Sequence, residues 1–401
     1  MARVVLTALT MRLQLTKDRT IDISLPGTGG GAVADVTGLE LYGGDAHGVP
    51  AVRIVRRKSA WQLQAAGFVK GPEGGLPQSW EESARPDSMT LPAPFRAPHA
   101  ALAVNSPYAI FTQSTADSVL QDMARGLPDP QAAAAEPVKR RLAIRRPAAP
   151  KPPQPSLAAA VPAAPAKLPE PGVPTAFNGM RFTVKPLAEE NIHLEAALPE
   201  FQTLWLSRLL PEGHRPTAAS IQVADAALMA SVLAQPALKE ADGNALVMFV
   251  RSDRVFFAGY KGGRPVLWRR CPVRGGYLAM HEAVKRGLGV DDSMVTAVLE
   301  DNLVDPRSAL ESFIHPVLSE LELSRAYLAG KHSLKLDRVL LMGLPAGAKH
   351  WCEFAREFFW MDMTAPGVFD GLVPPPRGEI AADGAYLTAL GAALAATEAE
   401  T

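Results

Sequence analysis

Three short motifs in this sequence combine residue types that can carry out chemistry. Residues 27–32 read Gly-Thr-Gly-Gly-Gly-Ala, the GxGxxA pattern of dinucleotide-binding turns. That pattern must open a helix, but the chain runs from Ala32–Asp35 directly into Thr37-Gly38, so we interpret it as a glycine turn. Gly330-Lys331-His332-Ser333 lacks the first glycine and the adjacent hydroxyl residue of a phosphate-binding loop. His281-Glu282 has no second histidine four residues on, so the pattern excludes a metalloprotease motif.

The composition narrows the class of protein further. At 401 residues the chain is long enough for two domains, and 47% hydrophobic with 20% charged residues is typical of globular proteins. Its 41 basic residues equal its 41 acidic ones, which argues against a nucleic-acid partner. The eight histidines are scattered, and Cys271 and Cys352 each lie in an apolar segment. We therefore expect reduced, buried thiols and no metal site.

The sequence predicts neither a membrane span nor a secretory signal. No run approaches the roughly eighteen consecutive apolar residues that a spanning helix needs. Met1–Leu25 mixes charged residues with short apolar runs and has no long apolar centre. We expect a cytoplasmic protein.

The segment from about Asp129 to Pro174 consists mostly of alanine and proline. Proline fixes φ and lacks an N–H donor, so this segment is predicted to be an extended, solvated linker that packs on nothing. Its basic residues are Lys139, Arg140, Arg141, Arg145, Arg146 and Lys151. They could contact anionic lipid headgroups, but a charge run that keeps the linker soluble is the simpler interpretation.

Short strand-like runs form a three-strand meander on each side of this linker. The runs are Val36–Tyr42, Val49–Arg57 and Trp61–Val69 on one side, and Ala245–Val250, Val255–Tyr260 and Pro265–Val273 on the other. They are rich in branched and aromatic residues and are separated by polar or glycine turns. The repetition indicates two related lobes.

Segments whose apolar residues recur at helical spacing lie before and after the second meander. Before it we expect a helix over Gln202–Leu210, a strand over Ile221–Val223 and a helix over Asp225–Leu233. After it we expect helices over Tyr277–Leu288 and Pro306–Ala329, a strand over Leu336–Met342, and helices over Lys349–Phe359 and Ala385–Ala396. Meander, helix, strand and helix form an α/β half-unit, so the expected fold class is α/β.

The stretch from Phe201 to Leu394 resembles the PilM family of type IV pilus assembly proteins, relatives of the division protein FtsA with an actin-like ATPase fold. The pieces that resemble the family are Phe201–Leu233, Lys261–Gly276 (KGGRPVLWRRCPVRGG), Asp337–Gly347 (DRVLLMGLPAG), Pro366–Leu372 and Ala385–Leu394, with Gly38–Val55 and Ala60–Val69 before the linker. The resemblance implies a two-lobed actin-like (ribonuclease H-like) fold, each lobe a mixed sheet with helices.

The resemblance also implies a division into domains. Residues 1–35 form an N-terminal extension, 36–128 the first lobe with the start of an inserted subdomain, 129–175 the linker, 176–234 the rest of the first lobe, and 235–401 the second lobe. The inserted subdomain is expected between about Ser106 and Leu198, and Asp117–Gly126 resembles its helix.

By the same resemblance, the family's nucleotide site has decayed here. Glu40 and Tyr42, followed by Gly43 and Gly44, stand where the first phosphate hairpin reads D-x-G-[ST]. Phe249 and Arg251 stand at the Asp and Gly of the second hairpin, and Gly343 with Pro345 stands at the adenosine turn.

Three features of these residues weaken a nucleotide site. Phe249 cannot hold a cation, Tyr42 and Arg251 occupy space that phosphates need, and Pro345 removes a donor. We expect no catalytic residue, no metal and no cofactor; residual binding of ATP with Mg²⁺ stays open as an alternative. Buried Tyr42 and Phe249 would then join the lobes by apolar contact.

The implied function is a cytoplasmic scaffold, peripheral at the inner membrane, of a type IV pilus or type II secretion-like assembly. The family holds the cytoplasmic segment of a PilN-like inner-membrane protein in a groove of the inserted subdomain. One alternative is an active actin-fold ATPase or sugar-kinase-like phosphotransferase, which needs an aspartate in each lobe. Another is an FtsA-like division protein, which needs an amphipathic C-terminal anchor that Gly391–Thr401 lacks. Homo-oligomerisation stays open.

Overall fold

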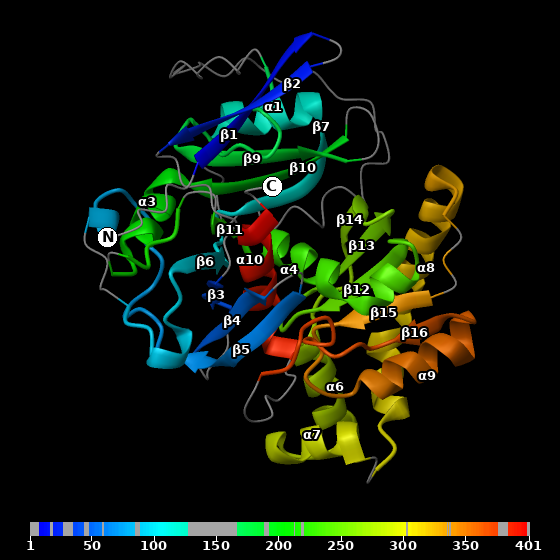
Figure 1. Cartoon of the computed structure of the whole chain (residues 1–401). Coiled ribbons are helices and arrows are strands. Elements are labelled where there is room, and N and C mark those ends of the chain that lie inside the picture. The colour runs from blue at the N-terminus through cyan, green and yellow to red at the C-terminus, as the bar shows by residue number, and fades with distance from the viewer. Residues whose placement is uncertain are drawn as a thin grey trace, which may run out of the picture.

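The computed structural model describes residues 8–16, 19–26, 35–43, 48–57, 60–84, 89–126, 167–187, 192–211, 213–217, 220–301, 304–334, 336, 338–375 and 384–398. These residues form two lobes, a subdomain inserted in the first lobe, and a hairpin of β1 (Ala8–Thr16) and β2 (Arg19–Pro26) (Figure 1). No helix in these ranges combines the length and apolar composition needed to cross a bilayer.

The first lobe is built on a five-stranded mixed sheet. Its strands are β3 (Asp35–Leu41), β4 (Val49–Arg57), β5 (Ala60–Val69), β6 (His99–Val104) and β11 (Ile221–Val223), in the order β11-β6-β3-β4-β5. β3, β4 and β5 pair antiparallel, whereas β3 with β6 and β6 with β11 pair parallel.

The second lobe repeats this plan. Its strands are β12 (Ala245–Val250), β13 (Val255–Lys261), β14 (Arg264–Arg270), β15 (Arg338–Met342) and β16 (Asp362–Thr364), in the order β14-β13-β12-β15-β16. Counted along the chain, both sheets read 3-2-1-4-5, with the same parallel and antiparallel pairs. The prediction of equivalent meanders in two separate sheets is confirmed, and the architecture is the two-lobed actin-like fold.

Two helices, α4 (Ala224–Ser231) and α10 (Leu387–Glu398), lie between the two sheets (Figure 1). One apolar cluster joins the inward faces of both sheets to these helices. β3 and α10 lie so close together that their contact requires glycine. A Cβ on Gly38 of β3 would lie 1.9 Å from the carbonyl oxygen of Ala389 on α10. A Cβ on Gly391 of α10 would lie 1.8 Å from the carbonyl oxygen of Ala227.

Further helices cover the outer faces of the sheets. α6 (Tyr277–Leu288), α7 (Asp292–Asp301), α8 (Arg307–His332) and α9 (Ala348–Phe359) share an apolar cluster with the outer face of the second sheet. α3 (Glu200–Arg208) packs on the outer face of the first sheet, and the short α5 (Pro236–Glu240) precedes β12. Buried on both faces, β12 reads as the continuous apolar run Ala-Leu-Val-Met-Phe-Val.

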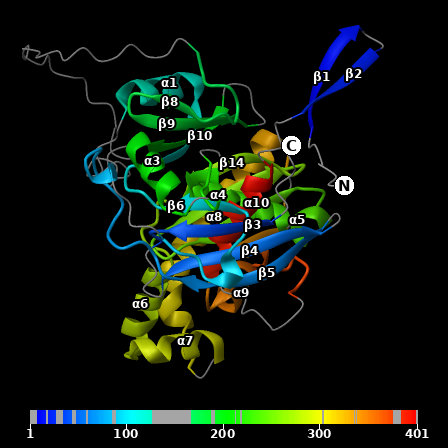
Figure 2. The same cartoon turned by 60° about the vertical axis from the view of Figure 1, so that its left-hand side comes forward.

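The inserted subdomain is a four-stranded antiparallel sheet under one helix, at the top of Figure 2. Its strands are β7 (Ile110–Thr115), β8 (Thr175–Phe177), β9 (Met180–Pro186) and β10 (Ile192–Pro199), in the order β7-β10-β9-β8, and its helix is α1 (Ala116–Arg125). It lies in the range predicted for an insertion.

A buried carboxyl group lies inside this subdomain. Glu195 of β10 is fully buried, and neither of its carboxylate oxygens has a hydrogen-bond partner of normal geometry. Burial and the charge of Asp122 on α1 raise the pKa of Glu195 to about 8, and the nearby hydroxyl of Ser114 on β7 opposes this shift slightly. Glu195 is therefore mainly protonated at neutral pH, which spares the subdomain an unpaired buried charge.

Most of the predicted alanine- and proline-rich linker lies outside the described residues. Its last part, residues 167–174, is described, and Leu168 packs against the apolar cluster under α1. The backbone N–H of Gly172 donates to the carbonyl oxygen of Val184 at 2.8 Å. The expectation that the whole segment packs on nothing is wrong at this end, because an N–H group there completes the edge of the subdomain sheet.

The helices and strands predicted from apolar spacing are present, with ends that differ by a few residues. The elements that were not predicted are β6, the four subdomain strands β7 to β10, α5, α7, β16 and the two strands of the β1–β2 hairpin. β16 is only three residues long, so it has no apolar run of its own to reveal it.

The glycine contact between α10 and α4 gives a test of how closely these two helices pack. Gly391→Ala should lower the free energy of unfolding by about 3 kcal/mol or more, because its Cβ meets backbone rather than a flexible side chain. Gly330→Ala on α8 is the control, since an added Cβ there meets nothing within 4 Å. It should leave stability unchanged or raise it by up to about 1 kcal/mol. Urea denaturation followed by circular dichroism measures both, and equal effects would contradict the close contact.

Candidate functional site

The alternation of side chains along the two central strands brings Glu40 and Arg251 to one place. Successive residues of a strand point to opposite faces. Val36 and Gly38 of β3 face the helices between the lobes, so Glu40 continues this inward row. Phe249 of β12 faces the same helices, so Arg251 continues the corresponding row of the second lobe. Both rows end at the carboxyl ends of the parallel strand pairs, where α/β sheets usually form their sites.

Glu40 and Arg251 form an ion pair that joins the two lobes. The guanidinium of Arg251 donates to Oε1 of Glu40 and to the hydroxyl of Thr388 at the start of α10. Nδ2 of Asn105, directly after β6, donates to the same carboxylate oxygen at 2.8 Å. The side chains of Arg251 and Glu40 are 12% and 5% exposed. We call Glu40, Asn105, Arg251 and Thr388 the interlobe cluster.

More charged groups surround this cluster. Burial raises the pKa of Asp225, in the first turn of α4, although Arg254 and Arg251 oppose the shift. Burial alone would lower the pKa of Arg251, but the charges of Glu40 and Asp225 outweigh it and raise that pKa. Burial and the charge of Arg254 lower the pKa of Arg270. Arg251 therefore stays charged and paired within the protein.

Phe249 and Tyr42 lie in different parts of the core. Phe249 is fully buried on the inward face of β12, with its ring centre 6.2 Å from that of Trp268. Tyr42 has a φ of 61°, which takes it out of the β3 row, and its ring packs against the outer core of the first lobe. Burial raises the pKa of its phenol to about 12. The expectation that Tyr42 and Phe249 together join the lobes is wrong for Tyr42, because its backbone turns it away.

The glycine positions of the predicted site are only partly brought together. Gly43 lies against Glu40, since an added Cβ would be 2.9 Å from Oε1 of that residue. Gly343, with a φ of 89°, lies against the carbonyl oxygen of Val250. Pro345 is exposed, and Gly44 lies outside the described residues. Glu40, Gly43, Arg251 and Gly343 thus meet near one point, and Phe249 lies behind it.

Sequence reasoning missed three residues at this point. Asn105 directly follows the apolar run of β6, and Asp225 opens an apolar helix, so strand and helix ends could have indicated both. Thr388 lies within the apolar run of α10 and gave no signal.

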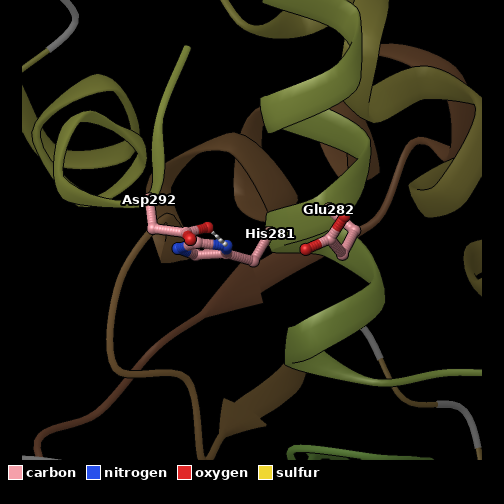
Figure 3. A group of neighbouring side chains, drawn as sticks. All are labelled: His281, Glu282 and Asp292. Carbon is pink, nitrogen blue, oxygen red and sulfur yellow. Dashed lines mark ion pairs between the residues drawn. The ribbon is translucent and has the colours of Figure 1, made fainter.

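One group of potential metal ligands lies elsewhere, on the exposed side of α6 and α7. Ligand atoms of His281, Glu282 and Asp292 lie within 4.8 Å of one another. In Figure 3 the carboxylate of Asp292 lies against the ring of His281, with Glu282 on the other side. Nζ of Lys285 contacts the Asp292 carboxylate at 2.8 Å, and this hydrogen bond raises the pKa of the lysine. A cation would have to displace that ammonium group, so we assign no metal to this cluster.

A large groove lies between the inserted subdomain and α4. Its volume is about 730 Å³, within the range of roughly 300–1,000 Å³ typical of ligand sites. Its lining comes mainly from β9, β10, β11, α4 and the start of β14, and it includes Ala395 of α10. None of the nucleotide-site positions predicted from the sequence lines this groove.

The repeated strand order and the shared helices define a two-lobed α/β protein of the actin-like fold. Comparison with solved structures finds a PilM–PilN type IV pilus biogenesis complex, 16% identical, covering 90% of this chain and 98% of that chain with a TM-score of 0.49. It also finds a protein of actin-like ATPase fold and unknown function from Bacteroides thetaiotaomicron, 10% identical, covering 84% and 91% with a TM-score of 0.35. No family model and no curated protein matches the sequence.

The interlobe cluster predicts strong coupling between its two charged residues. Arg251→Met should lower the free energy of unfolding by about 3–5 kcal/mol, because the Glu40 carboxylate is left buried with only Asn105 as a partner. Glu40→Gln combined with Arg251→Met should cost clearly less than the two single changes added together. Urea unfolding of the four proteins measures this. The exposed pair Lys70–Glu73 is the control and should show no measurable coupling. Additive effects of the changes at Glu40 and Arg251 would contradict the prediction that these two residues are coupled.

Proposed function

We propose that this protein is a cytoplasmic scaffold, peripheral at the inner membrane, of a type IV pilus or type II secretion-like assembly. It holds the cytoplasmic segment of a PilN-like inner-membrane protein. The observation that carries this proposal is the groove beside the inserted subdomain, the part of the fold for which the sequence resemblance implies a peptide site. The groove is lined mainly by aliphatic side chains with a few polar groups, as peptide and ligand sites usually are.

The interior of the cleft supports a scaffold rather than an enzyme. Phosphoryl transfer depends on metal ions and backbone donors that surround the phosphates. Here the carboxylate that would hold Mg²⁺ is occupied by Arg251 and Asn105, and Phe249 offers no second carboxylate. In this proposal the ion pair takes over the role of a nucleotide in joining the lobes.

The alternative of an active ATPase or phosphotransferase gives a direct test of the cleft. The full chain with Mg-ATP should release phosphate no faster than its Glu40→Ala variant, because the metal and phosphate positions are filled. Phe249→Asp combined with Arg251→Gly should lower stability and still show no turnover. A steady rate in the unaltered protein that Glu40→Ala abolishes would establish the enzyme alternative.

The partner is tested by capture from detergent-solubilised inner membranes of the bacterium that encodes the chain. The full chain should retain a single-pass protein, identified by mass spectrometry, and Ala230→Trp should lose it because the indole fills the groove wall on α4. Ala326→Trp, on an exposed position of α8, is the matched control and should retain it. Failure to capture such a protein, or equal capture by both variants, would refute the proposal.

A further inference from the structure

We infer that the segment held in this groove is an extended peptide that carries carboxylates on one side and apolar side chains on the other. The inference rests on the proposed function, because it names the chemistry of the partner segment at the same groove. It is drawn from how charge and apolar surface are divided between the two walls.

One wall of the groove carries a row of cations. On β9, Arg181, Thr183 and Lys185 face the groove, whereas Met180, Phe182 and Val184 face α1. Alternation thus places both basic side chains of this strand on one face. Arg264, at the start of β14, adds a third cation to the lining.

These cations have no partner among the described residues. No ion pair or hydrogen bond joins the side chains of Arg181, Lys185 or Arg264 to another described group, and Nε of Arg181 is buried without an acceptor. The described lining contains no aspartate or glutamate at all. Glu195, the one carboxylate on the described strands of the subdomain sheet, faces α1 on the opposite side. A buried donor without an acceptor is costly, so a ligand carboxylate there would be stabilised.

The other wall is apolar and helical. Ala226, Met229, Ala230 and Leu233 recur at the spacing of one helix face, and all line the groove. Leu194, Ala196 and Leu198 of β10 line it beside the cationic row. Small residues on α4 leave room for larger side chains of an occupant.

The two walls together define the occupant. Residues four apart on a strand are separated by about 13 Å, the spacing between Arg181 and Lys185 on β9. An extended segment running along β9 would therefore meet both cations with carboxylates about four residues apart. Its intervening side chains would pack on α4 and β10. Charge complementarity of this kind mainly determines partner choice.

The test is a selection of groove-dependent peptides. The full-length protein is panned with a phage-displayed library of random peptides of about twelve residues, and binders that also bind Ala230→Trp are discarded. We expect the retained peptides to be richer in aspartate and glutamate than the library. A synthetic copy of the best binder should lose about tenfold in affinity when its acids are changed to amides, as measured by fluorescence polarisation.

Charge reversal on the protein gives the second arm. Arg181→Glu with Lys185→Glu, and separately Arg264→Glu, should abolish the preference for acidic peptides. Arg208→Glu with Lys239→Glu, two exposed cations outside the groove, should leave it unchanged. Three results would overturn the inference. The retained peptides could be neutral or basic, no groove-dependent peptide could be found, or the acidic preference could survive the charge reversal. If membrane capture still depends on Ala230 in that case, the proposed function stands and only the charge of the segment is wrong.

Discussion

The packing of α10 and α4 on the first-lobe sheet depends on two backbone contacts that only glycine permits. Gly38 lets α10 lie directly on β3, and Gly391 lets α4 lie directly on α10, so these three elements stack with no side chain at either crossing. Because backbone meets backbone, this distance has almost no freedom to change. Thr388 lies three residues before Gly391 on the same helix, and Glu40 lies two residues after Gly38 on the same strand. Glu40 and Thr388 of the interlobe cluster are therefore held relative to each other by these contacts.

That placement explains why an ion pair is stable at this buried point. Two charges removed from water cost more than their attraction returns unless geometry and extra hydrogen bonds compensate. Asn105 and Thr388 supply those hydrogen bonds, and the aligned ends of β3 and β12 hold the pair without ordering flexible loops. In actin-like folds of this layout, a ligand in the cleft would stabilise the closed state by mass action. Here the ion pair is made by side chains of the two lobes themselves. It is therefore present at every ligand concentration.

Much of this architecture could be predicted from the sequence, and the exceptions have physical causes. The meanders, α6 and β11 followed from apolar periodicity and turn residues. β16 and the edge of the linker did not, because three-residue strands and single backbone hydrogen bonds leave no periodic signal. In the sequence, Glu40 and Arg251 stand out separately, as two departures from the nucleotide-site motif of the family. Their contact could not be foreseen, since 211 positions separate them and they belong to different lobes. The position predicted for Tyr42 was wrong because nothing in the neighbouring sequence indicates that this tyrosine adopts a positive φ.

The helix α4 connects the two parts of the molecule that carry the functional argument. One face of it, including Ala227 and Leu228, belongs to the core between the sheets, and Ala226 with Ala230 forms the apolar wall of the groove. The hydroxyl of Tyr260, on β13 of the second lobe, donates to the carbonyl oxygen of Met229 at 2.9 Å, so the second lobe also holds this wall. A groove with one wall fixed to both lobes keeps its shape only while the lobes stay together. The buried ion pair and the apolar cluster between the sheets therefore both help to keep this groove in one shape; if the proposed peptide binds there, a preformed groove lowers the entropy cost of binding it.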